Sequence, residues 1–142
     1  MKIGLDTSFI VPLIAEPSEF HDRTWAAFQE LREGGAEFVV TGHALLEAFS
    51  VLTRSPEPIK TLPREAERSL RDIFSNAIMT RFDQDDAWTA IAHTISRGYH
   101  GGRIYDAVIA LATFEAGARV LLTWNVKHFL TIAPFGLEIR EP

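Results

Sequence analysis

Short apolar segments, each ended by polar or turn-forming residues, recur along the chain and predict the strands of a sheet. They are rich in valine, isoleucine, leucine and phenylalanine, and most show little alternation with polar residues, which is typical of strands buried on both faces. We expect strands at residues 2–5, 38–40, 78–82 and 120–123, and a fifth at residues 137–139.

Between these segments, apolar residues recur every three or four positions, which predicts helices with one face toward a core. Residues that favour helix N-termini precede several of them. Helices are expected to begin at Thr7 or Ser8, at Ser18, at Thr41, at Asp83 and near Asp106, with a further one over residues 66–77. In the helix opened by Thr41, the predicted core-facing stripe consists of Leu45, Phe49 and Leu52.

The alternation of strands and helices predicts the fold class. Buried strands separated by helices are typical of an α/β protein, in which a parallel sheet of four to five strands is covered by helices on both faces. In such sheets, ligands bind beyond the carboxyl ends of the strands. Polar residues that directly follow a strand are therefore the first candidates for a functional site.

The composition limits the kinds of protein and site that remain. The chain has 142 residues, 46% of them hydrophobic and 23% charged, so we expect a single domain over residues 1–142. Cysteine is absent, which excludes disulfides, thiolate zinc sites and cysteine nucleophiles. No apolar run is long enough to cross a membrane, and Asp6 and Pro12 interrupt the first one, so a cytoplasmic protein is expected.

Four side chains with oxygen atoms are predicted to meet at one edge of the sheet. Asp6 follows the first strand and Asn125 follows the fourth, whereas Glu47 lies in the second turn of its helix and Asp106 in the first turn of its own. Helices that run antiparallel to the strands begin at the edge where the strands end, so all four should share that edge. Carboxylate and amide oxygens without cysteine suit Mg²⁺ or Mn²⁺ better than zinc. Two carboxylates about 6 Å apart repel by roughly 3 kcal/mol at an effective dielectric near 20, so a cation would stabilise the group.

Each of these residues also has an ordinary structural explanation when it is taken alone. Asp6 and Asp106 could cap helices, where the helix dipole favours a negative charge. Glu47 could be a solvated side chain on a polar helix face, and Asn125 a turn residue. Only their joint placement favours a metal site.

The net charge of −5 argues against a protein that gains its affinity by coating phosphates with lysine and arginine. An acidic chain can still act on nucleic acid when metal ions bring positive charge to the reacting phosphate. Arg54, Arg97, His100 and Arg103 are candidates for phosphate contacts, although each taken alone is better explained as a solvated surface residue.

In order and spacing, several short motifs resemble those of PIN domains of the VapC type, the toxin half of a toxin–antitoxin pair. The resemblance extends over nearly the whole chain. The motifs are Asp6-Thr7-Ser8, an isolated Glu47, Tyr105-Asp106-Ala107-Val108-Ile109-Ala110, Leu122-Thr123-Trp124-Asn125 and the closing Lys127-His128-Phe129.

This resemblance implies a PIN-like parallel sheet and divalent-metal-dependent cleavage of RNA. It also implies a homodimer and a small antitoxin protein as partner. Asp6, Glu47 and Asp106 match the three acidic positions of the family, so they would carry the catalysis and, with Asn125, hold Mg²⁺ or Mn²⁺. Thr7, Ser8, Arg103 and Thr123 would contact the substrate, or the three hydroxyls would fix the carboxylates. Asn125 and His128 stand where the family often has aspartate, which makes a second tightly held metal doubtful.

Two other functions remain open at this point. An aspartyl phosphatase would also place an aspartate directly after the first strand, but such enzymes usually have a second aspartate two residues on, where this chain has Ser8. A non-catalytic PIN-like module that binds RNA or a protein would explain Asn125 and the negative charge. Metal-dependent cleavage of RNA, abolished by Asp6→Asn, separates the enzyme from the binding module.

Overall fold

The computed structural model describes residues 1–142 and consists of five strands and seven helices. In chain order these are β1 (Lys2–Leu5), α1 (Thr7–Ile14), α2 (His21–Glu33), β2 (Glu37–Val40), α3 (Gly42–Arg54), α4 (Pro63–Ile73), β3 (Ile78–Met79), α5 (Gln84–Ser96), α6 (Arg103–Glu115), β4 (Val120–Leu122), α7 (Val126–Ile132) and β5 (Glu138–Arg140). None of the helices combines the length and the hydropathy that a membrane-spanning helix needs.

All five strands are parallel and lie in the order β3-β2-β1-β4-β5, which confirms the predicted parallel sheet. The chain first adds β2 and β3 on one side of β1, and then β4 and β5 on the other side. The carboxyl ends of β1 and β4 therefore form a topological switch point, the place in such sheets where ligands usually bind.

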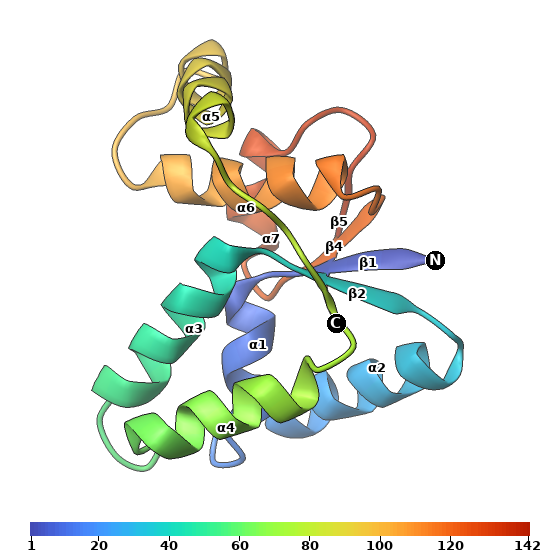
Figure 1. The fold of residues 1–142 in the computed structure, drawn as a ribbon, viewed down its shortest axis with the longest axis vertical. Coiled ribbons are helices and arrows are strands. Elements are labelled where there is room, and N and C mark those ends of the chain that lie inside the picture. The colour runs from blue at the N-terminus through green and yellow to red at the C-terminus, as the bar shows by residue number, and fades with distance from the viewer.

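Helices cover the sheet on both faces, as predicted (Figure 1). Helices α1 to α4 lie on one side of the sheet, and α6 and α7 lie on the other, with α5 packed on the outside of α6. Because β1 lies between β2 and β4, α1 begins between the start of α3 and the turn after β4. The beginning of α1 is therefore at the centre of the carboxyl edge.

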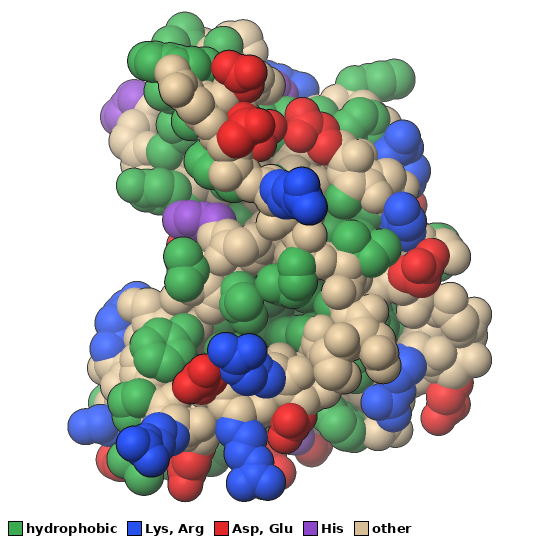
Figure 2. All heavy atoms as spheres, in the orientation of Figure 1, with side chains coloured by type: hydrophobic (Ala, Val, Ile, Leu, Met, Phe, Trp, Pro, Cys, Tyr) green, Lys and Arg blue, Asp and Glu red, His purple; other side chains and the backbone are tan.

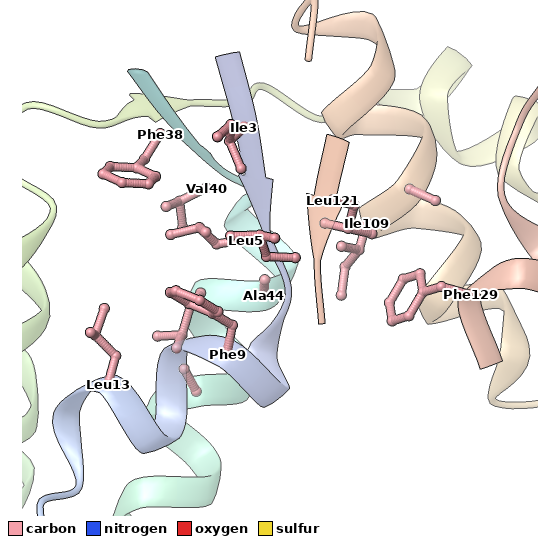
Figure 3. Packing of buried hydrophobic residues seen from close by; sticks show 14 of the residues in the cluster. Ile3, Leu5, Phe9, Leu13, Phe38, Val40, Ala44, Ile109, Leu121 and Phe129 are labelled. Carbon is pink, nitrogen blue, oxygen red and sulfur yellow. The ribbon is translucent and has the colours of Figure 1, made fainter. Parts of the chain in front are cut away.

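The hydrophobic core lies on both sides of the sheet (Figure 3). Phe9 and Leu13 of α1 pack with Leu5 and Val40 of the central strands, and Phe129 of α7 lies with Ile109 and Leu121 on the other side. All of these side chains are buried. Burial of such side chains removes apolar surface from water and holds the helices against the sheet.

Gly4 lets α6 approach the central strand. A Cβ atom at Gly4 would lie 2.2 Å from Cγ2 of Thr113, a fully buried residue of α6. Gly4→Ala is expected to lower the free energy of unfolding by about 1–3 kcal/mol, because the short, buried Thr113 side chain cannot move aside. Urea denaturation measures the loss. Adding Thr113→Ala should restore most of the stability, and Gly42→Ala, where no atom lies within 4 Å, is the control. Unchanged stability in Gly4→Ala would contradict the close contact.

Several predicted helix starts need correction, whereas the caps at Thr41 and Asp83 are confirmed. Helix α1 is capped by Asp6, not by Thr7 or Ser8, because its carboxylate accepts a hydrogen bond from the Ser8 backbone N–H. Helix α2 begins at His21 rather than at Ser18, and α6 begins at Arg103, three residues before Asp106. The third strand contains only Ile78–Met79.

The predicted core-facing stripe of α3 is also wrong in part. The buried residues of this helix are Ala44, Ala48 and Leu52, whereas Phe49 is 38% exposed. Helix α1 packs directly against α3, and small alanine side chains permit that close approach. The larger Leu45 and Phe49 instead lie on the side of α3 that faces α4.

Candidate active site

Asp6 is the most buried carboxylate at the carboxyl edge, with only 3% of its surface exposed. Its Oδ2 atom accepts hydrogen bonds from the Ser8 backbone N–H at 3.2 Å, from the Ser8 hydroxyl at 2.7 Å and from the Thr123 hydroxyl at 2.8 Å. All three donors are neutral. Burial raises the pKa of Asp6 because it disfavours the charged form, and the hydrogen bonds offset part of that increase.

Ser8 and Thr123 join the ends of β1 and β4 around this carboxylate. Their hydroxyl oxygens lie 3.0 Å apart, the Trp124 N–H donates to the Ser8 hydroxyl at 2.9 Å, and the Asn125 N–H donates to the Thr123 hydroxyl at 2.9 Å. Thr123 is fully buried. It therefore orients Asp6, and the expected contact with substrate is not open to its hydroxyl.

Asp106 projects from the first turn of α6 and is held by two groups. Its Oδ2 atom lies 3.1 Å from Arg103 Nε and 3.9 Å from His128 Nδ1. Burial raises the pKa of Asp106, the Arg103 charge counters part of the increase, and the charge of Asp6 adds to it. Gly102 occupies the N-cap of α6, so Asp106 is not the helix cap. The two aspartates are close enough to repel each other.

The Arg103 guanidinium makes several contacts within the protein. Besides Asp106, it donates to the His128 carbonyl and to the Thr131 hydroxyl, and its guanidinium lies 4.4 Å from the centre of the Tyr99 ring. These contacts tie α6 to α7. Arg103 is therefore positioned to anchor Asp106, and its expected contact with substrate stays a prediction.

Glu47 lies on α3 with its carboxylate held between two residues. Oε2 accepts a hydrogen bond from the Thr7 hydroxyl at 3.0 Å, and Oε1 lies 3.4 Å from His43 Nε2. The His43 ring stacks on Tyr105, with ring centres 4.8 Å apart and the planes at 2°. His43 therefore bridges α3 and α6. The i, i+4 spacing of His43 and Glu47 was the sequence signal for their contact.

Asn125 occupies the N-cap of α7, but its side chain makes no capping hydrogen bond. The turn after β4 is stabilised instead by the backbone, because the Asn125 carbonyl accepts from the N–H groups of His128 and Phe129. The amide side chain lines the same cleft as the acidic residues. This placement favours Asn125 as a member of the predicted metal site over Asn125 as a residue that only stabilises the turn.

These residues share a cleft of about 550 Å³ at the carboxyl edge. Figure 2 shows the left outline of the molecule hollowed between α6 and α3, where the strands end. Residues of α1 lie between α3 on one side and the turn after β4 on the other. The lining includes Asp6, Thr7, Ser8, Glu47, Asp106 and Asn125, as predicted, and Arg54 is its only arginine or lysine. Thr123 and Arg103 lie behind this lining.

The chemistry of the acidic residues fits a divalent cation, although their carboxylates do not form a compact group of three. No three acidic or histidine side chains are close enough to form a ready metal site. Asp6 and Asp106 repel each other, whereas Glu47 is turned toward Thr7 and His43. Each of the three carboxylates has hydrogen-bond donors of its own. The neutral partners of Asp6 leave its charge without a counterion, and hard oxygen ligands are those that Mg²⁺ and Mn²⁺ prefer.

Comparison with known proteins agrees with this architecture. Residues 3–129 match the model of the PIN domain. Ribonuclease VapC40 of Mycobacterium tuberculosis is 32% identical over 97% of both chains, and Ribonuclease VapC27 of the same organism is 29% identical over 96% of this chain and 94% of its own.

Solved structures share the fold at low identity. One is the structure of VapBC2 from Rickettsia felis bound to a DNA fragment from its promoter. It matches with a TM-score of 0.72 at 17% identity, and the match covers 100% of this chain and 99% of that chain. Mycobacterium tuberculosis VapC20, a toxin that cleaves the sarcin–ricin loop, has a TM-score of 0.68 at 15% identity, with 89% of this chain and 92% of that chain covered. The matching family model and the 32% identical relative together show that the chain belongs to the PIN domain family.

Proposed function

We propose that this protein is a divalent-metal-dependent endoribonuclease that hydrolyses RNA phosphodiester bonds, and that it is the toxin of a VapBC-type toxin–antitoxin pair. The observation that carries the proposal is the pair of carboxylates, Asp6 and Asp106, both with raised pKa, beside Glu47 in one cleft. The relatives named ribonucleases support the substrate class.

In this proposal Asp6 and Asp106 hold the Mg²⁺ or Mn²⁺ ion, with Glu47 and Asn125 acting directly or through water. When bound, such an ion lowers the pKa of a coordinated water and neutralises charge on the phosphate. Glu47 is the most exposed of the three carboxylates and is fixed by Thr7, so it is placed to orient the attacking water and accept its proton. Arg54, on the same helix, is placed to contact a flanking phosphate.

The proposed partners are an RNA substrate, a small antitoxin protein and a second copy of the chain. The VapBC2 structure supports the antitoxin, because it pairs a protein of this fold with its partner. The purified protein should cut a fluorogenic RNA with Mg²⁺ or Mn²⁺ and not with EDTA, and a small protein that co-purifies with it should suppress the cutting. The alternative function is a PIN-like module that binds RNA without cleaving it. It is favoured by the lack of three acidic or histidine side chains close enough to hold a metal ion. Such a module should bind the RNA and release no products under any of these conditions.

Asn125→Asp tests whether residue 125 belongs to the metal site. The change adds a carboxylate at nearly constant volume, so we expect tighter binding of Mn²⁺ and half-maximal cleavage at a lower metal concentration. The metal-free variant should be less stable, because another charge joins the repelling aspartates. Calorimetric titration with Mn²⁺ measures the difference. Asn76→Asp, just before β3 at the opposite edge of the sheet, is the control. Superimposable isotherms for Asn125→Asp and wild type would remove Asn125 from the site.

A further inference from the structure

One wall of the cleft is aromatic and is not explained by metal binding. The rings of Phe20 and Trp124 lie 4.6 Å apart between centres at 40°, and both residues line the cleft. The Arg23 guanidinium lies 4.6 Å from the centre of the Trp124 ring. Phe20 is 38% exposed, so part of its ring is open to the cleft that it lines.

This wall is rigid and close to the acidic residues. The Trp124 indole N–H donates to the Thr24 hydroxyl at 3.0 Å, and its backbone N–H donates to the Ser8 hydroxyl. The same Ser8 hydroxyl donates to Asp6. Two hydrogen bonds therefore connect the aromatic wall to the Asp6 carboxylate. A ligand group on Phe20 would therefore lie in the same cleft as the acidic residues.

The cleft is acidic, so RNA must gain part of its affinity for it from interactions other than charge attraction. Its lining has three carboxylates and one arginine, and the whole chain carries a charge of −5. Release of counterions from phosphates contributes little affinity to so acidic a surface. Stacking of nucleobases on aromatic side chains supplies an attraction that is independent of net charge and tolerant of sequence.

We propose that Phe20, supported by Trp124 and Arg23, is the stacking site for an unpaired nucleobase of the RNA strand. This inference rests on the proposed ribonuclease function and specifies the substrate further. A base within a duplex has both faces covered by its neighbours, so only a single-stranded or unstacked nucleotide can use the site. Arg54, the one arginine of the cleft lining, is then available for a neighbouring phosphate.

A mutant cycle between protein and ligand tests the stacking site. Fluorescence anisotropy measures binding of a labelled oligoadenylate of about ten nucleotides and of a ribose–phosphate chain of equal length without bases. All proteins carry Asp6→Asn, which should keep the RNA intact. Phe20→Ala should weaken binding of the oligoadenylate by roughly 5- to 150-fold, and binding of the abasic chain hardly at all. Phe20→Leu, which retains apolar contact with Trp124, should show a smaller loss.

The control is Phe135→Ala, because Phe135 is 98% exposed in the turn before β5 at the opposite edge and should not affect either ligand. Equal losses on both ligands would show that Phe20 acts only on the structure, and unchanged affinity for both would also overturn the stacking site. If a duplex bound as tightly as the oligoadenylate and Phe20→Ala weakened both equally, the requirement for an unpaired base would be overturned. Gel analysis of the same RNA with the wild-type protein and Mg²⁺ separates this inference from the proposed function. Absence of cleavage there would contradict the ribonuclease, whereas the anisotropy measurements test only the stacking site.

Discussion

Asp6→Asn is expected to lower the rate of RNA cleavage by roughly two to three orders of magnitude, the scale of losing one main electrostatic group in a catalytic site. Asp6 is the carboxylate that the structure orients most completely, through Ser8 and Thr123. The amide oxygen of asparagine can accept the same hydrogen bonds, so the fold should be retained. The missing charge would then remove the ligand of the cation without disturbing its surroundings.

Initial rates on a fluorogenic RNA at saturating Mg²⁺ measure this loss, and far-UV circular dichroism checks the fold. Asp85→Asn is the matched control, because Asp85 is an exposed residue in the first turn of α5 and lies outside the cleft. It should cut at the wild-type rate. An Asp6→Asn protein with wild-type activity would exclude this carboxylate from the mechanism, whatever the activity of the other variants.

Millimolar Mn²⁺ is expected to stabilise the wild-type protein strongly and Asp106→Asn only weakly. Binding to the folded state at a concentration about 100-fold above Kd adds roughly 2.7 kcal/mol, which raises the Tm of a domain of this size by roughly 5–10 °C. Without metal, Asp106→Asn should melt no lower than wild type. Burial raises the pKa of Asp106 in spite of Arg103, so the folded protein disfavours this charge.

The contribution of Asp6 and Asp106 to the stability of the metal-free protein should decrease as the pH rises. Burial raises the pKa values of Asp6 and Asp106 above 3.8, so between that value and the raised values the folded metal-free protein binds more protons than the unfolded chain. The stability that these groups contribute is therefore present below about pH 3.8 and is lost as the pH rises through their raised pKa values. Mn²⁺ binds the deprotonated carboxylates, so its stabilising effect should increase over the same interval.

Thermal melts of wild type and Asp106→Asn, with EDTA and with Mn²⁺, measure these effects from about pH 4 to about pH 7.5, the range in which carboxylates lose their protons. The difference in free energy of unfolding between the two proteins isolates Asp106 from the other acidic groups. Asp85→Asn should follow wild type in both buffers. A metal-free Asp106→Asn that melts well below wild type, together with no effect of Mn²⁺ on wild type, would assign Asp106 a structural role instead.

The helices, the strands and the edge of the sheet that holds the site could be predicted, because each depends on residues close together in the sequence. Buried strands and helices differ in the period of their apolar residues, and the caps at Thr41 and Asp83 bond to backbone groups only three residues away. The alternation of the two kinds of element requires a parallel sheet, and Asp6 and Asn125 follow strands that end at one edge. For these reasons the four oxygen-bearing residues were correctly assigned to a common cleft.

The features that were predicted wrongly or missed depend on tertiary packing instead of on local sequence. The stripe of α3 was misassigned because Ala44 and Ala48 give a weak hydrophobic signal, although close contact with α1 requires small side chains there. Arg103 could not be recognised as the anchor of Asp106 from the sequence alone, because its other contacts come from α7, more than twenty residues away along the chain. The aromatic wall of Phe20 and Trp124 joins residues 104 positions apart (124 − 20).

Local patterns along the chain were therefore enough to predict most of the elements, the parallel sheet and the meeting of acidic side chains at its carboxyl edge. The directions of those side chains depend instead on how the helices pack. The tertiary structure buried Asp6 under Ser8 and Thr123, turned Glu47 toward Thr7 and His43, and left Phe20 at the surface of the cleft. The orientation and pKa of a side chain depend on desolvation and on donors from distant segments, and those are set only when the helices pack on the sheet.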